Sequence, residues 1–198
     1  NLRAAGAIVL AKTQMTELAN WVAGPPGMPT NYNSLNGYGF NPYDPRRNPR
    51  DPREDTFDGR PALATGGSSS GTGTAASFWG ANVGTETSGS ILSPANANQL
   101  AAVKPTVGRI SRHGIIPITA DQDTAGPMAR SVTDAAILLG VLEGAQPDPN
   151  DPATSRCARE TDYTKYLDRG ALRGARIGIP RAYFYDAAKA PENAEPQG

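Results

Sequence analysis

One stretch of the chain, residues 66–74, consists only of glycine, serine and threonine. These side chains have too little volume to build a hydrophobic core, so the stretch must be a loop that serves another purpose. Glycine permits unusual dihedrals and close approach to a ligand, and successive N–H groups in such a loop can form an anion-binding hollow. A second hydroxyl-rich block, residues 84–93, runs on into apolar residues. A flexible Gly/Ser linker does not explain this second block.

The overall composition excludes several classes of protein. The 198 residues suffice for one ordinary domain, which 22 glycines and 18 prolines make rich in loops. Lys and Arg number 19, as do Asp and Glu, so we expect no nucleic-acid partner and no attraction to an anionic membrane. No apolar run is long enough for a membrane helix. A single cysteine, Cys157, excludes an internal disulfide and favours a reducing, cytoplasmic location.

The remaining segments predict an α/β arrangement in which strands alternate with helices. A helix is expected over residues 13–22, and a clearer one begins at Ser131, which forms a capping box with Asp134, and ends at Gly144. Strands or short extended segments are expected over residues 7–11, 101–105, 114–118 and 176–180.

Two segments are not expected to contribute to the core. Residues 41–65 hold five prolines and almost no aliphatic side chain, which predicts a surface excursion. Arginines and acidic residues alternate there and cancel one another, so a phosphate-binding role is not favoured. Residues 187–198 have no core-forming pattern and are expected to be a tail. The domain organisation predicted is one partial domain over residues 1–198.

Three catalytic interpretations compete for the serines. Residues 67–71 satisfy the G-x-S-x-G pattern of a nucleophile elbow, but that mechanism needs a histidine. The only histidine, His113, is flanked by charged and turn residues of an exposed bend. A phosphate-binding loop needs a lysine directly after its glycines, and none follows here. The third interpretation is a serine hydrolase in which a neutral lysine replaces histidine as the base.

Several long motifs, in a fixed order, carry a family resemblance. These motifs cover residues 66–71, 84–90, 104–108 and 123–134. They resemble the motifs of the amidase signature family, and residues 5–15 are similar to the segment that precedes the serine loop in that family. The resemblance extends over about residues 1–186. It implies an amidase-signature fold, with a mixed central sheet flanked by helices, that is incomplete in this chain.

The resemblance implies an amidohydrolase that cleaves a carboxylic amide through an acyl-serine intermediate, with no metal and no organic cofactor. By position, Ser90 matches the nucleophile, and Ser68 matches the serine that follows a cis peptide bond and relays the proton. The Ser68–Ser90 interval is slightly short for the family, which leaves Ser69 and Ser70 as alternatives to Ser68. The backbone N–H groups that match the oxyanion hole belong to Thr87, Ser88, Gly89 and Ser90. Gly66, Gly67, Ser69, Ser70 and Gly71 match the loop that supports them.

The resemblance does not supply a catalytic base within the chain. In the family the base is a lysine on a strand upstream of the segment that residues 7–11 resemble, and nothing in this chain matches that strand. Lys12 aligns with a different family lysine, and Lys104 lies in a Lys-Pro-Thr turn of structural character. We therefore expect a central portion of the enzyme, truncated at both ends and inactive alone.

Two alternatives stay open: a catalytically inactive fragment or binding module of the same fold, and the glutaminase subunit of an amidotransferase. Ser88 and Leu92 stand where many members of the family have glycine and arginine, which favours the branch of peptide amidases and general amidases. The expected partner is a small-molecule or peptide amide substrate. The sequence carries no signal for the oligomeric state.

Overall fold

The computed structural model describes residues 1–20, 31–48, 59–69 and 71–181. The chain divides into two compact units, residues 1–167 and residues 168–198. The second unit is described only up to residue 181, and there it forms turns followed by a stretch without regular secondary structure. The strand predicted over 176–180 does not form in this described stretch. Ile177 and Ile179 stay exposed there, because no neighbouring strand pairs with them.

A three-stranded antiparallel sheet organises the first unit. Its strands are β3 (Ala81–Glu86), β5 (Thr124–Ala129) and β4 (Ala101–Ala102), in the order β3-β5-β4. Every residue of the central strand β5 is buried. In the register of β3 and β5, Gly84 lies opposite Gly126 and Glu86 lies opposite Thr124. The carboxyl end of β3 therefore lies beside the start of β5.

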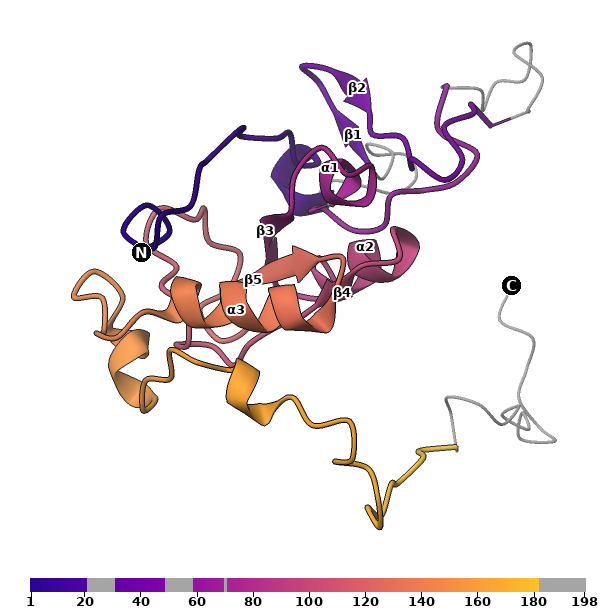
Figure 1. Ribbon diagram of the computed structural model, residues 1–198. Helices are drawn as coiled ribbons and strands as arrows, with labels where there is room; N and C mark the ends of the chain where they lie inside the picture. Colours follow the sequence, from indigo (N-terminus) through magenta and orange to yellow (C-terminus); the bar gives the residue numbers. More distant parts are fainter. Residues whose placement is uncertain (21–30, 49–58, 70, 182–198) are drawn as a thin grey trace, which may run out of the picture. The chain divides into compact units, whose positions relative to one another are not determined.

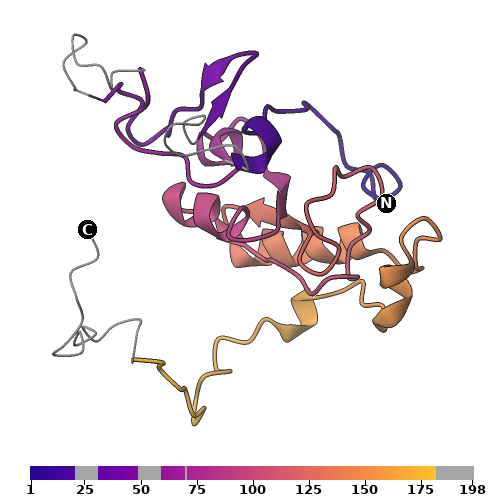
Figure 2. The same cartoon turned by 180° about the vertical axis from the view of Figure 1, so that it is seen from behind.

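Three α-helices pack around this sheet: α1 (Thr72–Ala75), α2 (Leu92–Ala97) and α3 (Val132–Glu143). The longest, α3, lies lengthwise along the sheet and contacts all three strands (Figures 1 and 2). Ser131 Oγ accepts from the backbone N–H of Asp134 at 3.1 Å and donates to its carboxylate at 2.6 Å. Gly144 ends the helix with a φ of 68°. The Ser131 N-cap and the glycine stop predicted from the sequence are confirmed. The Asp134 carboxylate accepts from the Ser131 hydroxyl and not from the Ser131 backbone N–H, so the reciprocal bond of the predicted capping box is not formed.

Two apolar clusters join the sheet to the helices. The first contains Ile91, Ala95 and Met128, and the second contains Ile110, Ala125 and Leu139. Because Met128 and Ala125 belong to β5, this strand is anchored to α2 through one cluster and to α3 through the other. Burying each large aliphatic side chain contributes about 1.5–3 kcal/mol. Through Ile91, the first cluster therefore holds the turn between β3 and α2 against β5.

Several elements near the amino terminus differ from the prediction. Residues 7–11 form an exposed, extended segment rather than a buried strand, and Ile8 is 84% exposed. Of the helix expected over 13–22, the structure describes only a short 3-10 turn, η1 (Glu17–Asn20), and residues 21 and 22 lie outside the described residues. Residues 114–118 form a loop, because the Ile118 N–H donates to the Asp123 carboxylate rather than to a strand.

The predicted excursion over residues 41–65 is anchored at its base. Asn41 is fully buried, and its side-chain amide donates to the carbonyl of Ala97 at 2.8 Å and to that of Ala64 at 3.2 Å. Arg47 and Pro61 pair as an isolated bridge between the two limbs. Residues 49–58 and the predicted tail over 187–198 lie outside the described residues.

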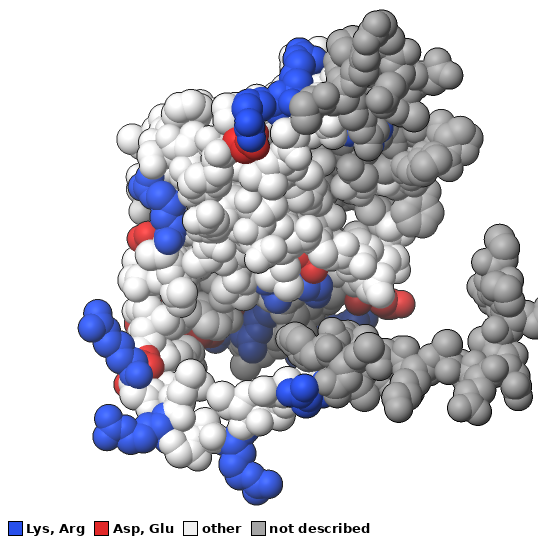
Figure 3. Space-filling view, turned by 90° about the vertical axis from the view of Figure 1, so that its right-hand side faces the viewer, with Lys and Arg blue, Asp and Glu red and all other residues white. Residues whose placement is uncertain are grey.

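The remaining short elements are β1 (Tyr32–Asn33), β2 (Gly37–Tyr38), η2 (Pro152–Arg156) and η3 (Thr164–Tyr166). On the face shown in Figure 3, charged side chains of both signs stand mostly around a broad uncharged area. Among the described residues, no helix combines the length and the apolar character needed to cross a bilayer.

Candidate active site

The serine loop packs directly against the turn that joins β3 to α2. A Cβ atom on Gly66 would lie 2.4 Å from the Cα atom of Pro94. A Cβ atom on Gly67 would lie 2.9 Å from the Cα atom and 3.3 Å from the Oγ atom of Ser90. Neither position has room for a side chain, so both residues must be glycine. The small-residue composition of the block thus serves the contact between two loops.

Ser69 fastens the serine loop to β3. Its Oγ atom accepts from the N–H of Thr85 at 3.0 Å and donates to the carbonyl of Thr85 at 3.0 Å. The Ser69 hydroxyl therefore bonds to both the N–H and the carbonyl of Thr85 in β3. These two bonds fix the position of the serine loop along the strand. Gly71 precedes α1 as its N-cap with a φ of 72°. Ser70, also predicted to support the loop, lies outside the described residues.

The turn over residues 87–90 presents backbone N–H groups that have no acceptor among the described residues. The next two N–H groups, of Ile91 and Leu92, both donate to Glu86 Oε2, at 2.7 and 2.9 Å. Gly89 has a φ of 87°, which glycine adopts without strain. Thr87, Ser88 and Ser90 line a cavity. Free amides at such a place can stabilise an oxyanion.

Ser68 and Ser90 line the same cavity, which has a volume of about 860 Å³. This volume is in the range of small-molecule sites. The polar part of its lining comes from the turn after β3 and from the start of β5. The apolar part comes from residues 15–19 and 115–118. Two hydroxyl groups from separate glycine-rich loops thus face one space.

Ser68 also lines a second, smaller cavity of about 220 Å³, so it lies at the boundary between the two. Ser68 is 1% exposed, and its Oγ atom makes no hydrogen bond to any described residue. Thr16 and Thr72 line the smaller cavity. Their Oγ1 atoms are also buried and make no hydrogen bond to a described residue. Buried hydroxyl groups normally have partners, so three such groups around one cavity indicate a polar binding site.

Two buried carboxylates at this site were missed by the sequence interpretation. Glu86 holds the start of α2 through the two N–H groups described above. Asp123 accepts from Thr87 Oγ1 at 2.5 Å and from the N–H groups of Ile118 and Thr119 at 2.7 and 2.9 Å. Asp123 therefore ties the turn over 87–90 to one wall of the cavity. For Glu86 the available signal was a single acidic residue inside the hydroxyl-rich block over 84–93. Asp123 follows Asp121 and Gln122, and nothing in this local sequence distinguished it.

No lysine or histidine lines either cavity in the described part of the chain. His113 and Lys12 are exposed, Lys104 is half-buried, and Lys165 forms an ion pair with Glu160. Among the described residues, no three His, Cys, Asp or Glu side chains gather as a metal site. The site thus offers hydroxyls, backbone amides and two hydrogen-bonded carboxylates.

Comparison with known proteins supports the resemblance found in the motifs. The profile of the family described as Amidase matches residues 1–195. The solved structure of the native peptide amidase from Stenotrophomonas maltophilia is 42% identical in sequence and superposes with a TM-score of 0.71. That superposition covers 87% of this chain and 32% of the peptide amidase. The α/β amidase-signature fold expected from the sequence is therefore confirmed.

Two curated relatives show a similar degree of identity. The protein of Arabidopsis thaliana named "Probable amidase" is 36% identical over 181 residues, which are 90% of this chain and 32% of the relative. One subunit of the glutamyl-tRNA(Gln) amidotransferase of Marinobacter nauticus is 38% identical over 188 residues, which are 94% of this chain and 34% of the relative. The chain thus spans about a third of the length of these relatives.

Proposed function

The chain belongs to the amidase signature family, and on this premise we propose that it carries the nucleophile and the oxyanion-binding turn of an enzyme that hydrolyses carboxylic amides. The observation that carries the proposal is that Ser68 and Ser90, from two separate glycine-rich loops, line one cavity. Ser90 attacks the amide carbon and forms an acyl-serine ester, and ammonia or an amine leaves. Water then hydrolyses the ester and restores the Ser90 hydroxyl.

Ser68 is the proposed proton relay. It takes the proton from the Ser90 hydroxyl as that oxygen attacks, and passes its own proton to a neutral amine. The proton then returns along the same path to the amide nitrogen, which leaves as ammonia or an amine as the C–N bond breaks. The smaller cavity supports this role, because the hydroxyl oxygens of Thr16 and Thr72 lie there without a described partner. Once the amine has taken the proton it is an ammonium with three donors, and the three hydroxyl oxygens of Ser68, Thr16 and Thr72 can accept from them. The amine belongs to a lysine other than those that the structure describes, since none of these lines the cavity.

The amides of residues 87–90 are proposed to receive the negative charge of the tetrahedral intermediate. Each well-placed donor of this kind stabilises the transition state by about 3–4 kcal/mol. Their positions depend on the two buried carboxylates. Glu86 holds the N–H groups at the far end of the turn, and Asp123 holds the Thr87 side chain at its start. The turn is thus fixed before substrate binds, which is what electrostatic stabilisation requires.

Among the branches of the family, we favour the peptide amidases and general amidases. Ser88 and Leu92 replace residues that are glycine and arginine in many other members, and the peptide amidase of known structure is 42% identical. The expected substrate is a small-molecule or peptide amide. The 38% identity to one component of an amidotransferase keeps the glutaminase as the alternative. A cytoplasmic location fits the single cysteine, Cys157, which is free.

The nucleophile is tested by changing Ser90 to alanine in the complete chain that the gene encodes. We expect the release of ammonia from a primary amide to fall by at least about a thousandfold, because the covalent step is lost. Ser93→Ala is the matched control, since Ser93 is exposed, lies in the same segment and does not line the cavity. Hydrolysis by the Ser90→Ala variant at the parental rate would reject the assignment.

A fluorophosphonate probe provides a readout that does not depend on knowing the substrate. An activated Ser90 is expected to react with the probe, and Ser90→Ala is expected to prevent the labelling. Ser68→Ala should slow the labelling and leave the fold intact, because it removes the relay alone. A protein that folds, hydrolyses no amide and does not label supports the alternative of an inactive binding module.

A further inference from the structure

We propose that the larger cavity selects amides whose acyl part is apolar and carries no negative charge, so that amides bearing a carboxylate, such as glutamine, are poor substrates. The proposal rests on the proposed function, because it names the substrate class of the same site. It is carried by two properties of the cavity lining, namely its apolar wall and the sign of its charges.

The apolar wall is built from two segments that are far apart in the sequence. Residues 15–19 supply Met15, Leu18 and Ala19, and residues 115–118 supply three isoleucines and a proline. Leu18 is 60% exposed and Ile116 is 81% exposed. A hydrocarbon acyl chain lying between these segments would remove apolar surface from water on both sides, and this favours binding.

The charges on the lining are all of one sign. Glu86 and Asp123 are the only ionisable side chains that line the cavity in the described part of the chain. Their carboxylate oxygens accept from backbone N–H groups and from the Thr87 hydroxyl, and neither forms an ion pair with a described residue. Neutral donors hold both carboxylates in place, and no cation of the described residues pairs with either of them.

The guanidinium of Arg112, which interacts electrostatically with Asp123, does not change this balance. Arg112 acts on Asp123, but its guanidinium is bound by Asp151 at 2.7 Å and does not line the cavity. A substrate carboxylate would therefore meet two like charges and no counter-ion among the described residues, whereas a neutral acyl group would meet no such repulsion and could lie against the apolar wall. Of two amides of equal size, the one with the uncharged acyl group is therefore the better substrate.

The inference is tested with two amides of matched shape, glutaramate and the analogue in which an isopropyl group replaces its carboxylate. In the complete chain, we expect kcat/KM for the neutral amide to exceed that for glutaramate by about 10- to 100-fold at low ionic strength. The ratio of kcat/KM for the neutral amide to kcat/KM for glutaramate should decrease in high salt, because the cavity is open to solvent and salt screens the repulsion.

A charge placed on the wall gives a sharper test. Ile118→Arg introduces a cation on the lining, and we expect it to raise kcat/KM for glutaramate about tenfold while that for the neutral analogue does not rise. Ile137→Arg makes the same substitution at a half-exposed position of α3 that does not line the cavity. This control is expected to leave the ratio of the two substrates unchanged.

Equal kcat/KM values for the two amides, or a preference for glutaramate, would overturn the inference and leave amide hydrolysis intact. Failure of the proposed function gives a different result, since no amide is then hydrolysed and Ser90 is not labelled. If no amide is hydrolysed, the preference for an uncharged acyl group can still be tested by binding. Calorimetry measures the dissociation constants of both amides with the Ser90→Ala variant. Equal dissociation constants would overturn it, and tighter binding of the neutral amide supports it.

Discussion

Gly67 and Asp123 are the single residues on which the geometry of the site depends most. Gly67 allows the serine loop to touch the backbone of Ser90, and Asp123 connects Thr87 to the wall of the cavity. The family resemblance assigned Gly67 to the loop that supports the proposed catalytic serines, and the small-residue block indicated a close approach of the backbone to a ligand. The contact of Gly67 with Ser90 was not predicted. The role of Asp123 was not predicted, because its partner Thr87 lies 36 residues away in the sequence.

Gly67→Ala is the substitution that tests this contact. The new Cβ atom would lie 2.9 Å from the Cα atom of Ser90, so Ser90, the proposed nucleophile, must move. We expect kcat to fall by at least about 100-fold, since a shift of about 1 Å in a reacting group is enough for such a loss. We also expect a destabilisation of about 1–3 kcal/mol from overpacking. Steady-state kinetics and urea unfolding measure the two effects.

Gly80→Ala is the control for this prediction, because a Cβ atom on Gly80 meets no atom within 4 Å. It should leave both the kinetics and the stability nearly unchanged. If Gly67→Ala keeps the parental kcat, the two loops do not meet in the way described.

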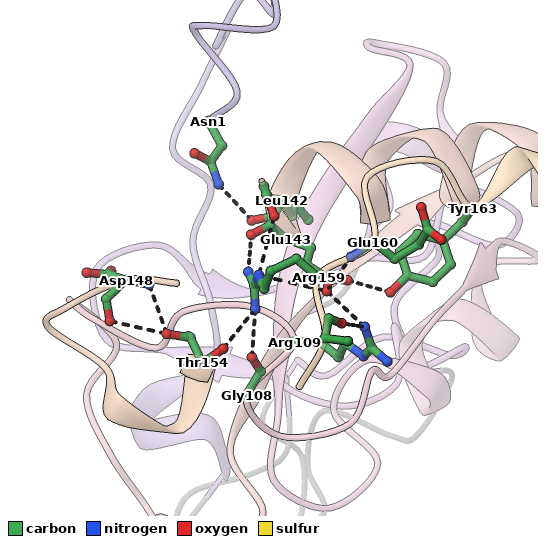
Figure 4. A network of polar contacts seen from close by, with 12 residues as sticks. Asn1, Gly108, Arg109, Leu142, Glu143, Asp148, Thr154, Arg159, Glu160 and Tyr163 are labelled. Carbon is green, nitrogen blue, oxygen red and sulfur yellow. Dashed lines mark hydrogen bonds and ion pairs between the residues drawn. The ribbon is translucent and has the colours of Figure 1, made fainter. Parts of the chain in front are cut away.

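At the scale of elements, a buried polar network joins the end of α3 to the segment that follows it (Figure 4). The side chain of Glu143 is fully buried and accepts from Arg109 at 2.9 Å, from the N–H of Glu160 at 3.1 Å and from the hydroxyl of Tyr163. Arg159 donates to the Glu143 carbonyl and to the carbonyl of Gly108 at 3.1 Å. The network holds residues 158–163 on α3 and thereby on the sheet.

Tyr163→Phe tests this connection. The substitution removes one donor to a buried carboxylate while keeping the ring, so we expect a loss of about 1–2 kcal/mol in the free energy of unfolding, measured with urea. Tyr166→Phe is the matched control, because the Tyr166 hydroxyl bonds to Glu160 at 3.1 Å at an exposed position. For this control we expect the free energy of unfolding to fall by less than about 0.5 kcal/mol.

The same residue predicts a dependence on pH. Burial, together with the hydrogen bond to Glu143, raises the pKa of Tyr163 from its ordinary 10.0 to about 12. Because the pKa is higher in the folded state, the contribution of Tyr163 is complete below pH 10 and is lost as the pH rises toward 12. Stability should therefore fall more steeply over this range in the parent than in Tyr163→Phe. An equal decrease of the free energy of unfolding with pH in the parent and in Tyr163→Phe would contradict the role given to the Tyr163 hydroxyl.

At the scale of the whole molecule, apolar side chains that the sequence predicted to be buried are exposed in the described chain. Ile8 and Leu10 lie in the segment expected to be a strand, and Ile177 and Ile179 lie in another such segment. Unpartnered apolar surface of this kind favours association and weakens cooperative folding. The chain also spans only about a third of the length of its relatives.

We therefore predict that residues 1–198, produced alone, bind the dye ANS and unfold over a broad range of temperature. The complete product of the gene should bind far less dye and unfold in a sharper transition. A narrow, cooperative unfolding of residues 1–198 without dye binding would show that the described core is sufficient for a stable fold.

The sequence by itself determined the features that depend on neighbouring residues. The Ser131 N-cap and the stop at Gly144 were predicted because each acts within a few positions of the chain. The roles of the glycine–serine blocks came from the family resemblance and stay a proposal. Only the tertiary structure decided the contact of Gly67 with Ser90, the place of Ser68 between two cavities and the bond from Thr87 to Asp123. These contacts join residues that are distant in the sequence, and such pairs leave no local period or spacing from which they could be inferred. The strand expected over 7–11 failed for the same reason, since a strand needs a neighbour that its own residues do not specify.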